Sequence, residues 1–185
     1  MNPVLADYDR QFTAIRDRIG RLVAGLEEED LQWRPAPEQW SMVECLEHLN
    51  SGWMVLPKLD RKIAEARDRN LIGEGPFRQP WLGWLYIRLV EPPVRVKVNA
   101  PRQFRPRSQP PSVEVVPRIL QLQEELSERV RSCDGLDVGA VRMRSPISRR
   151  FKMTLGQWFA FLAAHERRHL WQAENVKREN LAVES

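Results

Sequence analysis

Four segments of this 185-residue chain space their apolar residues alternately three and four positions apart, and this periodicity constrains the fold most. In residues 3–26 the apolar positions are Leu5, Tyr8, Phe12, Ile15, Ile19, Leu22 and Leu26. Such spacing places every apolar side chain on one face of an α-helix, and that face must be buried against another element. We therefore expect an all-α protein in which long helices share one core.

The same periodicity recurs in three later segments. Residues 41–70 carry Met42, Cys45, Leu46, Leu49, Trp53, Leu56 and Ile63; the segment after Ser112 carries Val116, Ile119, Gln123, Leu126, Val130 and Cys133; and residues 154–180 carry Trp158, Phe161, Leu162, His165, His169, Gln172 and Val176. Three of the four helix starts have capping signals, namely Asn2 before Pro3 and the pairs Ser41–Glu44 and Thr154–Gln157. Pro57 predicts a kink in the second helix, because its ring opposes the carbonyl of Trp53.

A proline-rich, basic stretch separates the second helix from the third. Residues 76–117 hold nine of the fourteen prolines and seven Lys or Arg against two Glu, so their net charge is +5 and that of the remaining chain is −1. The connection over residues 71–111 is far longer than the roughly 2 to 8 residues that join antiparallel neighbours in bundles. We expect it to cross a four-helix bundle and to leave the second and third helices parallel.

Local patterns predict little regular structure in the connections. Residues 81–89 favour a short helix, and residues 94–98 alternate like a brief strand or extended arm. Residues 27–40 are predicted to be a connection, and residues 134–153 are predicted to be irregular. No internal repeat interrupts the pattern, so we expect one domain over residues 1–185.

Composition indicates a soluble protein of a reducing compartment. The net charge is +4, and the uncharged stretches are shorter than the roughly 18 apolar residues of a membrane span. Two cysteines, Cys45 and Cys133, are too few for a disulfide framework and are predicted to be core thiols. The first residues contain Asp7 and no apolar run, so we expect no secretory signal and a cytoplasmic location.

Histidine is rare in this sequence, yet its positions are ordered. Of the three histidines, His165 and His169 stand four apart on the apolar stripe of the last helix, and His48 lies at the edge of the stripe of the second. Two imidazoles one turn apart can bind one ion. A histidine taken singly is more often a hydrogen-bonded core residue. The pair together with His48 instead predicts a site for one divalent metal ion (Zn²⁺, Ni²⁺ or Fe²⁺) with open coordination positions.

The string His165-Glu166-x-x-His169 also matches the zinc-protease signature HExxH. We do not favour a protease, because no histidine follows His169 as a third ligand and no edge strand for a peptide substrate is predicted nearby. Arg167 and Arg168 follow Glu166, so this glutamate is expected on a solvated, salt-bridged face.

Several neighbouring side chains have two interpretations each. Gln172 lies on the inward face and would either contact the substrate as a catalytic group or support a ligand ring. Glu44 is explained by its capping box, and Cys45 by burial, although each lies close enough to His48 to assist it. Aromatic residues in these helices line a pocket or fill the core; they are Trp53, Trp158 and Trp171.

Three segments resemble the DinB-like superfamily. WSMVECLEHL, residues 40–49, is similar to its W-S-x-x-E-x-x-x-H-L start of the second helix; TLGQWFAFLAAHERRHLWQ, residues 154–172, to its final helix; and NAPRQFRP, residues 99–106, to its crossover loop. The resemblance implies a four-helix bundle of up-down-down-up topology. It also implies a metal triad that falls on His48, His165 and His169.

The chemistry implied by the resemblance is broad. Members include thiol S-transferases that use bacillithiol or mycothiol, a mycothiol-dependent maleylpyruvate isomerase and metal-dependent hydrolases. We therefore expect a metal-dependent enzyme that acts on a small molecule, with a low-molecular-weight thiol or water as nucleophile. The competing hypothesis is a non-catalytic stress-response module, as a homodimer or with a protein or nucleic-acid partner.

The basic loop has its own alternatives. Its cations, Arg95, Lys97, Arg102, Arg105 and Arg107, would face an acidic thiol or substrate, contact phosphates, or simply be solvated. Only Phe104 lies among them for base stacking, so we do not expect nucleic-acid binding.

Overall fold

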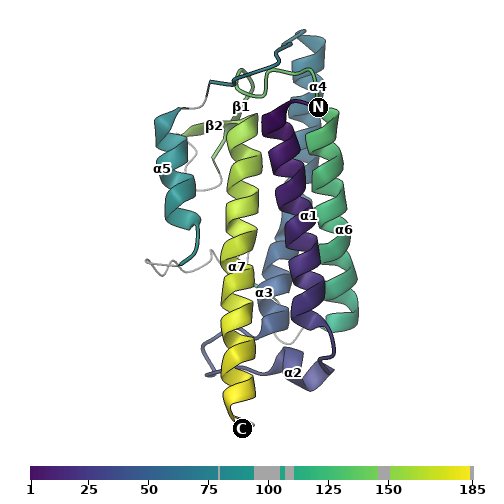
Figure 1. The fold of residues 1–185 in the computed structure, drawn as a ribbon, viewed down its shortest axis with the longest axis vertical. Coiled ribbons are helices and arrows are strands. Elements are labelled where there is room, and N and C mark those ends of the chain that lie inside the picture. The colour runs from purple at the N-terminus through teal and green to yellow at the C-terminus, as the bar shows by residue number, and fades with distance from the viewer. Residues whose placement is uncertain (79, 94–104, 107–110, 146–150, 184–185) are drawn as a thin grey trace.

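The computed structural model describes residues 1–78, 80–93, 105–106, 111–145 and 151–183, and it is mostly helical. The elements are α1 (Pro3–Val23), α2 (Glu28–Gln32), α3 (Met42–Leu49), the 3₁₀ helix η1 (Asn50–Met54), α4 (Leu56–Asp68), α5 (Trp81–Val90), α6 (Ser112–Ser132), β1 (Arg142–Arg144), β2 (Lys152–Thr154) and α7 (Leu155–Val183). Figure 1 shows α1, α3 with α4, α6 and α7 extended along one long axis, while α5 stands beside α7.

The three predicted capping signals are confirmed. The Asn2 side chain accepts a hydrogen bond from the backbone N–H of Val4 at the start of α1. Ser41 and Glu44 satisfy each other's backbone N–H groups at the start of α3, and Thr154 and Gln157 do the same at the start of α7. Because these caps fix where α3 and α7 begin, they also fix which residues face the interior further along each helix.

Polar contacts define how α1 lies against its neighbours. It is antiparallel to α6, since the Asn2 backbone N–H donates to Asp134 (3.0 Å) and Arg16 pairs with Glu124 (2.9 Å). It is parallel to α7, as shown by the pairs Gln11–Arg167 (2.7 Å), Arg18–Glu174 (2.5 Å) and Leu22–Lys177 (2.8 Å). The contacts advance in the same order along both helices, so the α1–α7 register is well defined.

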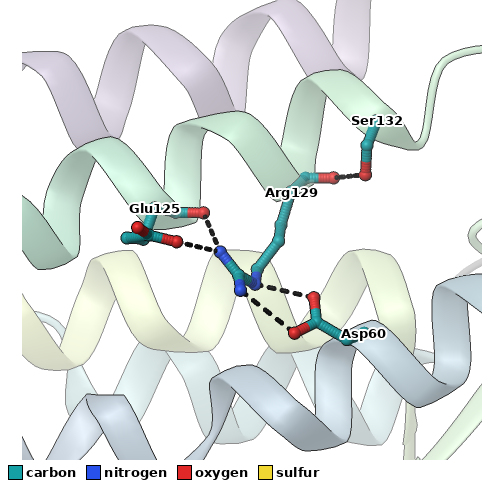
Figure 2. A network of polar contacts seen from close by, with 4 residues as sticks. All are labelled: Asp60, Glu125, Arg129 and Ser132. Carbon is teal, nitrogen blue, oxygen red and sulfur yellow. Dashed lines mark hydrogen bonds and ion pairs between the residues drawn. The ribbon is translucent and has the colours of Figure 1, made fainter.

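Arg129 of α6 joins that helix to α4 (Figure 2). Its Nε lies 2.8 Å from Asp60 Oδ1, and its Nη1 donates to the Glu125 carboxylate (2.6 Å) and backbone carbonyl (2.9 Å). The Ser132 hydroxyl donates to the Arg129 carbonyl (2.9 Å). A guanidinium shared between two carboxylates therefore ties α4 to α6.

The second predicted helix is interrupted rather than kinked. A 3₁₀ turn, η1, separates α3 from α4, and Pro57 lies in the first turn of α4, where its missing N–H leaves no hydrogen bond unmade. Gly52 within η1 packs closely on α6: a Cβ there would lie 2.8 Å from the Leu122 side chain, which would have to shift.

The expectation of an all-α chain is corrected by a small sheet. Strands β1 and β2 pair antiparallel within the segment predicted to be irregular, with the buried methionines Met143 and Met153 opposite each other. Each strand has only three residues, too few for alternation to stand out in the sequence. The predicted connection over 27–40 likewise contains the short helix α2. The predicted helix over 81–89 is confirmed as α5, and the strand expected over 94–98 lies outside the described residues.

The core runs through all the long helices. Cys45 and Cys133 are free, buried thiols, as predicted. Among the described residues, no helix is both long and apolar enough to span a membrane.

Candidate metal centre

The three histidines of the sequence meet at one point between α3 and α7. His48 comes from α3, and His165 and His169 come from successive turns of α7. One ring nitrogen of each lies within 4.8 Å of the corresponding nitrogens of the other two. His48 is buried, whereas His165 and His169 are partly exposed. The convergence predicted from the sequence is therefore present.

The spacing of these nitrogens fits a shared ion. His48 Nε2 lies 3.4 Å from His165 Nε2. Two nitrogens bound tetrahedrally at about 2.0–2.1 Å from Zn²⁺ are themselves roughly 3.3–3.4 Å apart. The ring centroids are 5.2 Å apart for His48–His165, 4.4 Å for His48–His169 and 4.7 Å for His165–His169. The three ligand nitrogens all lie within 4.8 Å of one another, close enough to share one ion.

The environment keeps the rings of His165 and His169 neutral, which is the form that binds a metal. Burial, and to a smaller extent the nearby His48 and the charge of Arg168, together lower the pKa of His165 to about 3. The pKa of His169 is also well below its usual value, first through burial and then through His165, His48 and Arg168. Lone pairs on uncharged imidazoles are therefore available near neutral pH.

Gln172 contacts one of the ligands directly. Its Oε1 lies 3.2 Å from His169 Nδ1. An amide oxygen only accepts, so Nδ1 carries the proton and Nε2 keeps its lone pair for a metal. This contact fits the ligand-supporting interpretation of Gln172; its predicted catalytic role remains a prediction.

Aromatic rings line two sides of the cluster. The Trp40 ring lies 5.1 Å from His48 and 5.9 Å from His169, measured between centroids. On the α5 side, Tyr86 stacks on Phe161 at 5.5 Å, and Phe161 lies 5.7 Å from His165. Trp40 precedes the cap of α3 and Phe161 lies one turn before His165, so both positions follow from helix geometry. Tyr86 belongs to a separate helix and had no signal in the sequence.

Glu166 is not on a solvated face, contrary to the prediction from its two arginine neighbours. The residue is only 2% exposed, and burial raises the pKa of its carboxyl to about 8 despite a hydrogen bond from Gln123 and the charge of Arg167. Its Oε2 has no hydrogen-bond partner among the described residues. The apolar neighbours at helical spacing, Leu162, Ala163, Leu170 and Ala173, were a signal for this burial. A base buried in this way does not face an open site, and the geometry gives no support to a protease.

Two candidate helpers of His48 have structural roles. The Glu44 carboxylate accepts from the Ser41 backbone N–H (2.9 Å) and pairs with Arg34 (2.6 Å). Cys45 is fully buried outside the histidine group, and burial raises the pKa of its thiol further above neutral. The capping and core interpretations therefore account for both residues.

A cavity lies on another side of α7. It measures about 500 Å³ and is lined by α1, α5 and α7, with Tyr8 and Trp84 among its walls. Arg167 reaches it and is held by Glu91 and Gln11. None of the three histidines lines this cavity. Of the basic loop, only Arg105 is described; Arg95, Lys97, Arg102 and Arg107 lie outside the described residues.

Comparison with known proteins identifies the family that this geometry suggests. The family model of the DinB superfamily matches residues 11–173. The chain belongs to the DinB superfamily. This match includes all three histidines of the cluster and Gln172.

A curated relative of this DinB-superfamily chain comes from Bacillus subtilis (strain 168). It is the protein YuaE, described as uncharacterized, which is 26% identical over 167 residues covering 90% of this chain and 94% of the relative. No solved structure matches the chain. The family assignment therefore supports the fold and the possible metal site without assigning a reaction.

Proposed function

We propose that this DinB-superfamily protein holds one divalent metal ion through His48, His165 and His169 and uses it as an enzyme to activate a thiol or water nucleophile. The observation that carries the proposal is the convergence of three imidazoles from two helices, with ligand atoms within 4.8 Å of one another. Structural metal sites normally have four protein ligands, whereas three leave room for a substrate.

The three imidazole donors restrict the choice of metal ion without identifying it. Imidazole nitrogens suit Zn²⁺, Ni²⁺ and Fe²⁺ alike. With open coordination positions, such an ion lowers the pKa of a bound thiol or water and so supplies a nucleophile near neutral pH.

The protein contributes position and environment. Gln172 orients the His169 ring, and Trp40 and Phe161 cover the rings of the cluster with apolar surface. His165 and His169 remain partly exposed, so a small molecule can reach them from solvent.

Transfer of a low-molecular-weight thiol to an electrophile is the leading reaction, and hydrolysis is the alternative. In the transfer, sulfur forms a bond to an electrophilic carbon, the thiol proton is released to water, and the leaving group departs with the electron pair of the broken bond. Because a bound metal would already lower the pKa of the nucleophile, the reaction needs no additional strong base.

The proposal includes the arrangement of the scaffold as a four-helix bundle of up-down-down-up topology. It is supported by the antiparallel α1–α6 contacts, the parallel α1–α7 contacts and the bridge from Asp60 of α4 to Arg129 of parallel α6. In this arrangement α3 and α7 are antiparallel neighbours, which places His48 opposite His165.

Elemental analysis and a thiol assay test the function. Protein purified without chelators should contain about one divalent metal ion per chain, and His169→Ala should lose it while its circular dichroism remains helical. The wild type should consume a thiol in the presence of 1-chloro-2,4-dinitrobenzene faster with metal than after chelation. Undiminished metal in His169→Ala would refute the ligand assignment, and equal rates with and without metal, for thiol consumption and for ester hydrolysis, would refute the catalytic role.

A further inference from the structure

Helix α5 forms a fixed wall beside the histidine cluster. Gln157 Nε2 of α7 donates to the Pro80 carbonyl before α5 (2.6 Å), and Arg167 Nε donates to Glu91 at its other end (3.1 Å). Gly83 is buried against Gln157, so the two helices are in close contact between these ties. The hydroxyl-bearing ring of Tyr86 is thereby held on Phe161, whose own ring lies next to His165.

Arg168 supplies a positive charge close to the histidines and to Tyr86. It follows His165 by three residues and directly precedes His169, and its charge acts on both rings and on the phenol of Tyr86. The side chain is partly buried, which weakens the screening of its charge by water. Burial also raises the pKa of Tyr86 to about 12, so the phenol remains a neutral hydrogen-bond donor.

A permanent positive charge beside three metal ligands requires an explanation. A guanidinium does not lose its proton in proteins, so it repels a divalent cation held by the neighbouring histidines. An anion placed between them attracts both charges and offsets that repulsion. Arg168 has five N–H donors in a planar fork, enough to hold one protein partner and still face a carboxylate.

We infer that Arg168 and the Tyr86 hydroxyl bind a carboxylate of the substrate at the edge of the histidine cluster. The inference rests on the proposed function and makes it more specific: the nucleophile or its acceptor carries a carboxylate a few bonds from the reacting atom. The adjacent Arg167 does not share this role, because Glu91 and Gln11 already hold its guanidinium on another side of α7.

A charge series of small thiols tests this recognition. Cobalt(II)-loaded protein is titrated with 3-mercaptopropionate, 2-mercaptoethanol and cysteamine, which are anionic, neutral and cationic at their far ends, and binding is followed by the sulfur-to-cobalt charge-transfer absorption. The affinity of each variant is divided by that of the wild type for the same thiol, which cancels the different thiol acidities. Arg168→Met should weaken 3-mercaptopropionate roughly tenfold, as expected for a charge-assisted hydrogen bond, and leave 2-mercaptoethanol within about twofold.

Matched variants separate recognition from general effects. Arg178→Met removes the same charge from the same helix at an exposed position ten residues away, roughly 15 Å along the axis, and should leave all three affinities unchanged. Tyr86→Phe should weaken only 3-mercaptopropionate, by a smaller factor. If Arg168→Met does not fold, Arg168→Lys retains the charge without the fork and should give an intermediate loss.

The outcomes distinguish the inference from the function on which it rests. Failure of the wild type to take up cobalt overturns the metal centre and this inference with it. Cobalt uptake and thiol binding with an equal loss for all three thiols in Arg168→Met, or with no loss, overturns the carboxylate inference alone.

Discussion

His48 Nε2 and His165 Nε2 lie 3.4 Å apart although 117 positions separate them in the chain. At this distance two protonated rings would repel strongly, so at most one proton occupies the space between them. The packing of α3 on α7 therefore favours neutral imidazoles. A metal cation between the two rings would attract the lone pairs of both nitrogens, whereas a proton on each ring would make the rings repel each other. The stability of the metal-free protein must then depend on pH.

Metal-free protein should become less stable as the pH falls below about 6.5. The pKa of His165 is lowered to about 3 in the fold, so the unfolded chain takes up its proton first and the stabilisation present above pH 6.5 is lost progressively towards pH 3. For His165 alone we expect a loss of roughly 1–2 kcal/mol at pH 5. Urea unfolding of chelator-treated protein at several pH values measures it.

The control for this pH dependence is the variant His165→Asn. It should show a shallower loss of stability between pH 6.5 and 5, while added zinc should stabilise the wild type and not the variant. A wild-type urea midpoint that stays constant over this interval would contradict neutral, closely apposed rings.

Glu166→Gln should stabilise the protein near neutral pH. The pKa of the buried carboxyl is raised to about 8, so the unfolded state ionises from about pH 4.5 while the folded state resists, and stability falls as the pH rises from 4.5 to 8. An uncharged amide of the same shape removes this loss, and we expect a gain of about 1–3 kcal/mol at pH 7.5. Glu128→Gln, at an exposed position on α6, is the control and should change little. Equal effects of the two substitutions on the urea midpoint would show that Glu166 is solvated.

The Glu166 case shows where the sequence is informative and where it is not. Periodicity placed His165 and His169 on the inward face correctly, because their neighbours at helical spacing are apolar and their own helix is long. Arg167 and Arg168 predict a solvated position for Glu166, yet its own neighbours at helical spacing are apolar too. The burial of Glu166 therefore follows its neighbours on the helix surface and not its neighbours along the chain.

Contacts between distant elements were the part that no pattern in the sequence revealed. Tyr86 reaches Phe161 only because α5 docks along α7, and a stripe of apolar residues does not say which helix it will meet. The β1–β2 pair was missed because three residues per strand give one buried methionine each. The histidines of the candidate metal site were therefore predictable, whereas the docking of α5 beside them was not.

Gln172→Leu should weaken metal binding about 10–100-fold without removing a ligand. The substitution breaks the contact with His169 Nδ1 and frees the ring to rotate and to change tautomer. Competition with a chromophoric chelator gives the affinity of the wild type and the variant, and turnover is then compared at saturating metal. Restored turnover at saturation identifies Gln172 as a positioning residue. Unchanged affinity with a lower rate would instead favour the catalytic role predicted from the sequence.

Gly83→Ala should loosen α5 from α7, because its Cβ would overlap the side-chain amide of Gln157. That side chain caps Thr154 at the start of α7 and also donates to the Pro80 carbonyl, so it cannot move without losing a hydrogen bond at one end. We expect a loss of about 1–3 kcal/mol in urea unfolding, typical of overpacking. Gly20→Ala is the matched control: no atom lies within 4 Å of its added Cβ, and within α1 it should stabilise by up to about 1 kcal/mol. Metal content should stay at one ion per chain in both variants, since neither residue touches the histidines. A Gly83→Ala protein as stable as the control would mean that α5 is not packed on α7.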